Sequence, residues 1–149
     1  MAAILLVAHA PQAQSLLAVA RHVYPEHTAR LAAADIDAGS GPAEAQAQIR
    51  AALAGLGAGD VLILADVFGA SPCKAALAVA DGVRSRVVAG VNVPMLWRAL
   101  CYSELPLDEL VTRAVDGGVQ GVMQVGVPRP QNQASQPARD DQVQHHDQQ

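Results

Sequence analysis

Hydrophobic residues follow two kinds of pattern along this chain. Runs of consecutive apolar residues at 4–8, 61–65 and 86–90 are typical of parallel strands that are covered on both faces. A weaker, alanine-rich run over residues 30–36 predicts a further strand. Between these runs, apolar residues recur at helical spacing. This spacing predicts helices that start near Gln12, Pro42, Pro72, Met95 and Pro106.

The order of these elements predicts an α/β fold. Strands and helices alternate until two helices follow one another near the end of the chain, so the pattern is that of a doubly wound, mostly parallel open sheet with helices on both faces. Gly117 and Gly118 are expected to loosen the end of the last helix, because glycine is a weak helix former. The apolar residues of 122–127 predict one final strand.

Composition limits the classes of function. A net charge of −4 without a basic block argues against nucleic acid as the main partner. No apolar stretch approaches the roughly 20 residues of a membrane span, and Met1 opens the chain without the positive flank of a signal peptide. The two cysteines lack metal-site spacing, so they are expected to be reduced thiols in a cytoplasmic protein. Residues 1–127 are expected to form one domain, and the Pro- and Gln-rich residues 128–149 a disordered tail.

Two polar side chains are expected to meet at the carboxyl edge of the sheet. His9 follows the first apolar run and Asp66 follows the run at 61–65, and these strands are neighbours in a doubly wound sheet. A carboxylate that accepts one imidazole N–H leaves the other ring nitrogen free to act as a nucleophile. After Asp66 comes a turn of small residues, and Ser71-Pro72 is typical of an N-cap and a first helical position. The N–H groups of such a helix start attract phosphate, so phosphoryl transfer to His9 is one hypothesis.

The same residues also fit ordinary structural roles. His9 could be a hydrogen-bonded loop residue, Asp66 could cap a turn, and Lys74 could contact a phosphate or face water. A nucleotide-binding α/β protein is a weaker alternative, because the chain has neither a Gly-x-Gly-x-x-Gly nor a Gly-Lys-Ser/Thr loop. Taken alone, the pattern indicates an anion-binding α/β domain.

Three segments together resemble a known family. An apolar N-terminal strand that ends in His9 is followed by Asp66-x-x-Gly69-x-Ser71-Pro72 and by Gly90-Val91-Asn92-Val93-Pro94-Met95-Leu96. This arrangement resembles the EIIA domain of the mannose-type phosphoenolpyruvate-dependent sugar phosphotransferase system, over residues 2–126. The stretch at 90–96 is the most specific part of the resemblance.

The resemblance implies a phosphotransferase component that forms a phosphohistidine. His9 would accept a phosphoryl group from phospho-HPr and pass it to an EIIB partner, with Asp66 orienting the imidazole. The turn of Phe68, Gly69, Ala70 and Ser71 would donate hydrogen bonds to the phosphate, and no metal or cofactor is expected. The family fold also implies a homodimer in which the C-terminal strand, here residues 122–127, is exchanged and added antiparallel to the partner's sheet.

Two features of the sequence bear on this interpretation: one leaves a regulatory role open, and the other concerns the backbone of the site. The sequence continues into no EIIB-like part, so a stand-alone regulatory EIIA, whose phosphorylation controls a partner without sugar transport, is the alternative. The family usually has glycine where this chain has Ala10 and Ala70. If those positions required a positive φ, alanine would be strained by about 1 kcal/mol.

Overall fold

The computed structural model describes residues 1–130, and its elements alternate between strand and helix along most of that length. The strands are β1 (Ala3–His9), β2 (Leu31–Ile36), β3 (Val61–Ala65) and β4 (Ser85–Ala89). The helices are α1 (Gln12–Val23), α2 (Pro42–Leu56), α3 (Ser71–Val79), α4 (Val93–Cys101) and α5 (Leu107–Gln120), with a short 3-10 helix at Pro25–His27. The strands and helices predicted up to residue 120 are thereby confirmed, with ends that differ by a few residues.

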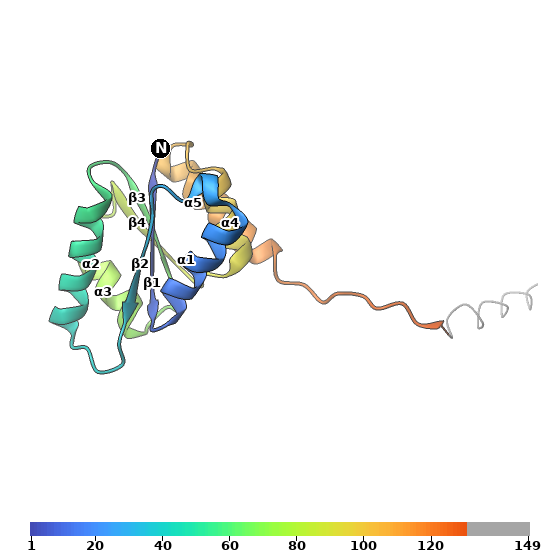
Figure 1. The fold of residues 1–149 in the computed structure, drawn as a ribbon, viewed down its shortest axis with the longest axis horizontal. Coiled ribbons are helices and arrows are strands. Elements are labelled where there is room, and N and C mark those ends of the chain that lie inside the picture. The colour runs from blue at the N-terminus through green and yellow to red at the C-terminus, as the bar shows by residue number, and fades with distance from the viewer. Residues whose placement is uncertain (131–149) are drawn as a thin grey trace, which may run out of the picture.

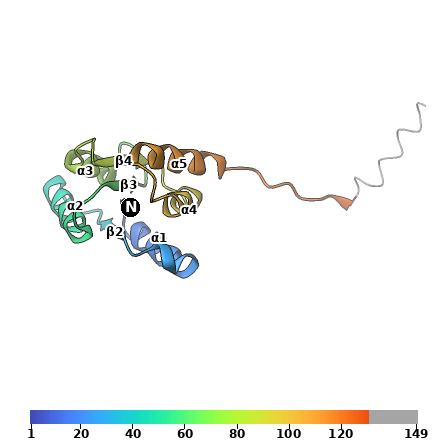
Figure 2. The ribbon, with the colours of Figure 1, turned by 90° about the horizontal axis from the view of Figure 1, so that it is seen from above.

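The strands form one parallel sheet in the order β2-β1-β3-β4. Helices α2 and α3 cover one face, whereas α1, α4 and α5 cover the other (Figures 1 and 2). The predicted α/β fold with a parallel sheet and helices on both faces is confirmed. Because β1 lies between β2 and β3, the carboxyl ends of β1 and β3 are adjacent, and Val7 is paired with Ala65.

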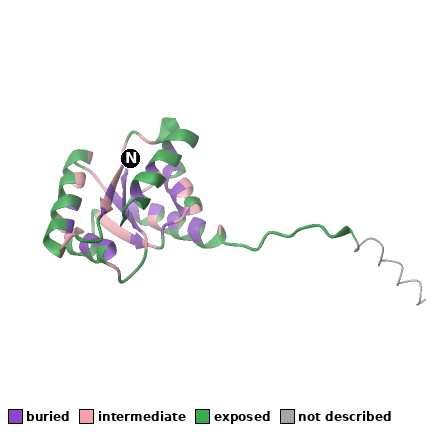
Figure 3. Cartoon of the chain, turned by 60° about the horizontal axis from the view of Figure 1, so that its bottom comes forward, coloured by how far each residue is buried: buried purple, intermediate pink, exposed green. Residues whose placement is uncertain are grey.

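The side chains of β1 supply both layers of the core. Ala3, Leu5 and Val7 pack toward α2 and α3, whereas the alternate residues Ile4, Leu6 and Ala8 pack toward the other three helices. All six are buried, as expected for a strand with helices on both faces (Figure 3). This burial makes β1 a rigid support for the residue that ends it, His9.

The last predicted strand is not formed within the described chain. Residues 122–129 are neither helix nor strand, and the side chains of Val122, Val125 and Val127 are 75%, 75% and 78% exposed. The sheet of residues 1–130 therefore has no antiparallel edge strand, and the expectation of one within a single chain is wrong. A strand needs a partner edge, and this segment extends away from its own sheet (Figure 1).

The expected loosening of α5 at Gly117 and Gly118 is also wrong. The helix continues through both glycines to Gln120. A Cβ at Gly117 would lie 2.7 Å from Arg98 Cβ, and one at Gly118 would lie 2.7 Å from Met95 Cε. The glycines therefore let α5 approach α4 closely, and this packing outweighs their low helix propensity.

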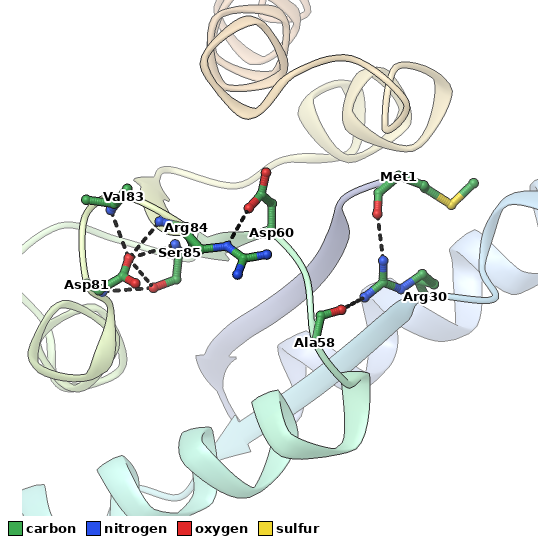
Figure 4. A network of polar contacts seen from close by, with 8 residues as sticks. All are labelled: Met1, Arg30, Ala58, Asp60, Asp81, Val83, Arg84 and Ser85. Atoms are coloured by element: carbon green, nitrogen blue, oxygen red, sulfur yellow. Dashed lines mark hydrogen bonds and ion pairs between the residues drawn. The ribbon is translucent and has the colours of Figure 1, made fainter.

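The amino edge of the sheet, opposite His9, is held by polar contacts (Figure 4). The Arg30 guanidinium donates to the carbonyl oxygens of Met1, Leu56 and Ala58 at 2.6, 3.1 and 3.2 Å. It thereby ties the N-terminus to the end of α2. Nearby, Arg84 Nε donates to Asp60 Oδ1 at 3.1 Å.

Two further expectations concern parts of the chain beyond this core. Most of the predicted tail, residues 131–149, lies outside the described residues. Within residues 1–130, none of the helices has the length and apolar character needed to cross a membrane.

Candidate functional site

His9 and Asp66 meet at the carboxyl edge of the sheet, as their positions at the ends of two strands predict. His9 Nδ1 lies 2.6 Å from Asp66 Oδ2, and the same oxygen accepts the His9 backbone N–H at 2.9 Å. Asp66 Oδ1 accepts the N–H of Val67 at 2.8 Å. Three contacts thus fix the carboxylate, and two of them also fix the backbone and ring of His9.

The Asp66 carboxylate remains ionised at neutral pH. Burial by itself would raise the pKa of Asp66, but hydrogen bonds from the His9 backbone, the His9 ring and the Val67 backbone outweigh burial and lower that pKa. An ionised carboxylate only accepts hydrogen bonds, so the proton between the two side chains belongs to His9 Nδ1. In the neutral form of the imidazole, Nε2 is then the ring nitrogen that carries the free lone pair.

The two side chains differ in exposure in a way that suits a reactive histidine. The side chain of His9 is 50% exposed, whereas that of Asp66 is 7% exposed. The carboxylate is therefore held inside the site while the imidazole faces outward. Within residues 1–130, no hydrogen bond engages His9 Nε2, so this nitrogen is available to an incoming electrophile.

In the turn between Asp66 and α3, each residue has a φ angle that its side chain permits. Gly69 has a φ of +93°, a conformation that a residue with a side chain rarely adopts. Ala70 has a φ of −89°, and none of the non-glycine residues at 1–130, Ala10 included, has a positive φ. The alanines that replace the glycines of the family therefore cause no backbone strain here.

The start of α3 lies one residue earlier than Ser71-Pro72 suggested. Ala70 is the N-cap, Ser71 is the first helical residue, and the helix has no side-chain cap. The backbone N–H groups of its first turn are therefore not satisfied by a capping side chain. The prediction of a helix start after this turn is confirmed, but the prediction of Ser71 as its cap is wrong.

Helix α3 is electrostatically the most open of the four helices that begin at this edge. Helix α1 is capped from another element, because Asp35 Oδ1 accepts the Gln14 N–H at 3.1 Å. Helix α2 carries Glu44 in its first turn, and Asn92 Oδ1 caps α4 through the Met95 N–H at 2.9 Å. Helix α3 has neither a capping side chain nor an acidic residue in its first turn. Its positive dipole end is therefore free to attract an anion.

Asp35 is a residue of this edge whose role the sequence pattern alone did not indicate. It lies on β2 one position before the end of the strand and is paired with Ala8, next to His9. Its carboxylate caps α1, whose own N-cap is Pro11 and has no side-chain cap bond. An acidic residue at a strand end beside a helix that lacks its own cap was the available signal.

The 90–96 stretch has a structural role in the described chain. Asn92 caps α4 through its side-chain oxygen, and its Nδ2 donates to the Gly118 carbonyl at 3.0 Å. Asn92 therefore joins the turn after β4 to the end of α5. Within residues 1–130, no group of three or more His, Cys, Asp and Glu residues is placed to hold a metal ion.

Comparisons with known proteins agree with this geometry. Residues 3–115 match the family model described as the PTS system fructose IIA component, EIIA-man. A stretch of 65 residues is 45% identical to the PTS system mannose-specific EIIAB component of Escherichia coli strain K12, covering 42% of this chain and 20% of that protein. The chain thus corresponds to a small part of the curated relatives that it matches.

Solved structures share the fold over most of its length. The mannose/sorbose-specific IIA subunit of the phosphotransferase system from Enterococcus faecalis is 28% identical, with a TM-score of 0.76 over 86% of this chain and 97% of that chain. The phosphotransferase component EIIA from Streptococcus agalactiae has a TM-score of 0.74 at 19% identity, over 83% and 97% of the two chains, and shows similarity of fold. Since the family model spans residues 3–115, this chain belongs to the mannose-type EIIA family of the sugar phosphotransferase system.

Proposed function

We propose that this chain is a phosphoryl carrier whose His9 accepts a phosphoryl group on Nε2 from the phosphohistidine of HPr. The observation that carries this proposal is the 2.6 Å contact between His9 Nδ1 and Asp66 Oδ2. This contact holds the imidazole in the tautomer whose free lone pair is on Nε2. The half-exposed ring presents that lone pair to a second protein.

The bonds that form and break in the transfer step involve only the two histidines and the phosphoryl group. The Nε2 lone pair of His9 forms a bond to phosphorus while the N–P bond of the donor breaks, and its electron pair returns to the donor nitrogen. The proton on His9 Nδ1 stays in place, so positive charge develops on the imidazole beside Asp66. The buried carboxylate stabilises that charge, and such preorganised electrostatic stabilisation is a major part of phosphoryl-transfer catalysis.

The phosphoryl oxygens would be held by the turn from Phe68 to Ser71. It connects Asp66 directly to the uncapped start of α3, where backbone N–H groups and the helix dipole favour an anion. The three other helices that begin at this edge have an acidic or capping side chain at that position. This difference favours α3 as the phosphate-binding element.

Onward transfer to an EIIB-type acceptor is the second half of the proposed activity. Family membership supports it, and the curated Escherichia coli relative is named as an EIIAB component. The HPr and EIIB-type partners implied by the family act in the cytoplasm, so we also infer a cytoplasmic location for this chain. We further propose a homodimer in which residues 122–127 add antiparallel to β4 of the partner, because the exposed apolar side chains of this segment have no strand partner within residues 1–130.

A labelling experiment tests the carrier function. Incubation with phosphoenolpyruvate, enzyme I and HPr should add one acid-labile phosphoryl group per chain. His9→Ala should abolish the label, whereas His22→Ala, which changes an exposed histidine of α1, should leave it unchanged. Label that persists in His9→Ala would contradict the proposal. Adding candidate EIIB proteins to the labelled chain then separates relay, in which the label moves, from a regulatory role, in which it stays.

A further inference from the structure

Lys74 is the single lysine of the chain, and its position is electrostatically unusual. It is the fourth residue of α3, close to the positive end of the helix dipole, where a cation is normally disfavoured. The ion pairs found within residues 1–130 involve other side chains and leave Lys74 without an acidic partner. An anion bound beside Lys74 would offset the unfavourable interaction between its ammonium group and the helix dipole.

Helix geometry directs the side chain of Lys74 toward the first turn of α3. Lys74 follows Ser71 by three residues, so the two side chains share one face of the helix. The Cα–Cβ bonds of a helix tilt toward its N-terminus, which directs the lysine stem back toward Ser71. Both residues line a cavity of about 170 Å³ between the first turns of α2 and α3, together with Ser40 and Gln46.

This cavity lies on the face of the sheet to which His9 belongs. Ala45 and Ala75 line it and pack in the same core layer as Val7 of β1. Side chains alternate along a strand, so the next β1 residue on that face is His9. The cavity, the start of α3 and the imidazole therefore share one face and one edge of the sheet.

We propose that the Lys74 ammonium group binds the oxygens of the phosphoryl group carried by His9. This inference rests on the proposed carrier function and adds a side-chain contact to the backbone donors of the turn. The four-carbon stem of lysine places a compact charge at a distance from its helix and carries three N–H donors. The charge neutralises part of the phosphoryl dianion in the phosphorylated protein and during transfer. No bond of Lys74 forms or breaks in the reaction.

The test compares a protein donor with a small-molecule donor. Phospho-HPr and phosphoramidate are each used as the donor, and the rate constant of labelling is measured for wild type, Lys74→Met and Lys74→Arg. Loss of a charge-assisted contact to the phosphoryl group should slow labelling about tenfold in Lys74→Met with both donors. Lys74→Arg, which keeps the charge, should recover most of the rate. The phosphorus NMR signal of the phosphohistidine should also shift in Lys74→Met.

A matched control separates this effect from a change of net charge. Arg50→Met removes one positive charge from an exposed position farther along α2 and should leave both rates unchanged. If phosphoramidate labels Lys74→Met and wild type at the same rate, the inference is overturned. This holds even if the rate with phospho-HPr falls, because Lys74 would then act on the donor protein and not on the phosphoryl group. A wild-type chain that neither donor labels overturns the proposed function itself and this inference with it.

Discussion

His9 Nδ1 and Asp66 Oδ2 lie 2.6 Å apart although the two residues are 57 positions apart in the chain. The contact exists because β1 and β3 are neighbours in the sheet and end at the same edge. Asp66 also accepts the backbone N–H of His9, so one carboxylate sets both the position of the histidine and the orientation of its ring. The reactivity of His9 is therefore expected to depend on Asp66 more than on any other side chain.

Replacing Asp66 with asparagine should slow phosphorylation of His9. The amide is uncharged, so it stabilises the positive imidazole less and no longer fixes the Nδ1–H tautomer. We expect the labelling rate with phospho-HPr to fall roughly 10–100-fold, or about 1.4–2.7 kcal/mol of transition-state stabilisation. Circular dichroism should show an intact fold. An unchanged rate would mean that Asp66 has only a structural role.

Asp35, which lies on β2, is expected to stabilise helix α1. Its carboxylate accepts the Gln14 N–H, so Asp35→Ala should lower the free energy of unfolding by about 1 kcal/mol, as for loss of an N-cap. Asp35→Asn keeps an acceptor oxygen and should lose less. Urea unfolding measures both, with Asp37→Ala, in the exposed loop after β2, as the control. Equal stabilities of Asp35→Ala and Asp37→Ala would refute the capping role.

Two glycine substitutions should have opposite effects. A Cβ at Gly121 would lie 2.3 Å from both Cβ and Cγ of Pro94, and the rigid ring cannot move aside cheaply. Gly121→Ala should therefore destabilise the protein by about 1–3 kcal/mol. Gly55, inside α2, has open space around it, so Gly55→Ala should stabilise by about 0.4–1 kcal/mol. Thermal unfolding of both variants would show whether the α4–α5 contact is as close as described; equal stability would speak against it.

The turn before β4 should lose stability in acid. Asp81 Oδ1 accepts the N–H groups of Val83, Arg84 and Ser85 (Figure 4), and these bonds, that of Ser85 first, lower the pKa of Asp81 to about 2. A depressed carboxylate pKa stabilises the folded state above the unfolded pKa near 3.9. That contribution is lost as the pH falls from about 4 through about 2.

The comparison of wild type with Asp81→Asn isolates this carboxylate from Asp66, whose pKa is also lowered. Urea midpoints should differ between the two proteins at pH 7 and converge as the pH approaches 2. A constant difference across this range would show that Asp81 ionisation does not contribute.

The exposed C-terminal segment should control the oligomeric state. If residues 122–127 pair with β4 of a second copy, Val125→Lys should weaken the dimer, because a charge would enter a covered strand. Val19→Lys changes a valine on the surface of α1, which is 44% exposed, and should not. Sedimentation velocity over a range of concentrations distinguishes the cases. A wild-type chain that sediments as a monomer throughout would refute strand exchange.

Local sequence determined most of the secondary structure. The apolar runs that form β1, β3 and β4, like the helical spacing between them, are patterns that span only a few residues. The side chains of these runs are buried on both faces of the sheet. The pair His9 and Asp66 was also predictable, because the carboxyl ends of neighbouring parallel strands meet at one edge.

The tertiary structure decided what depends on partners distant in the chain. The pattern of residues 122–127 suits a strand, but a strand forms only when it pairs with a sheet edge, and this segment extends away from the edges of its own sheet. Gly117 and Gly118 are weak helix formers, yet close packing against α4 keeps them helical. Asp35 caps a helix of another element, which no local capping rule reveals. The sequence by itself determined most of the helices and strands and the placement of His9 and Asp66 at the ends of two neighbouring strands. The fold decided which N–H groups, charges and edges remain free, because these depend on contacts between distant segments.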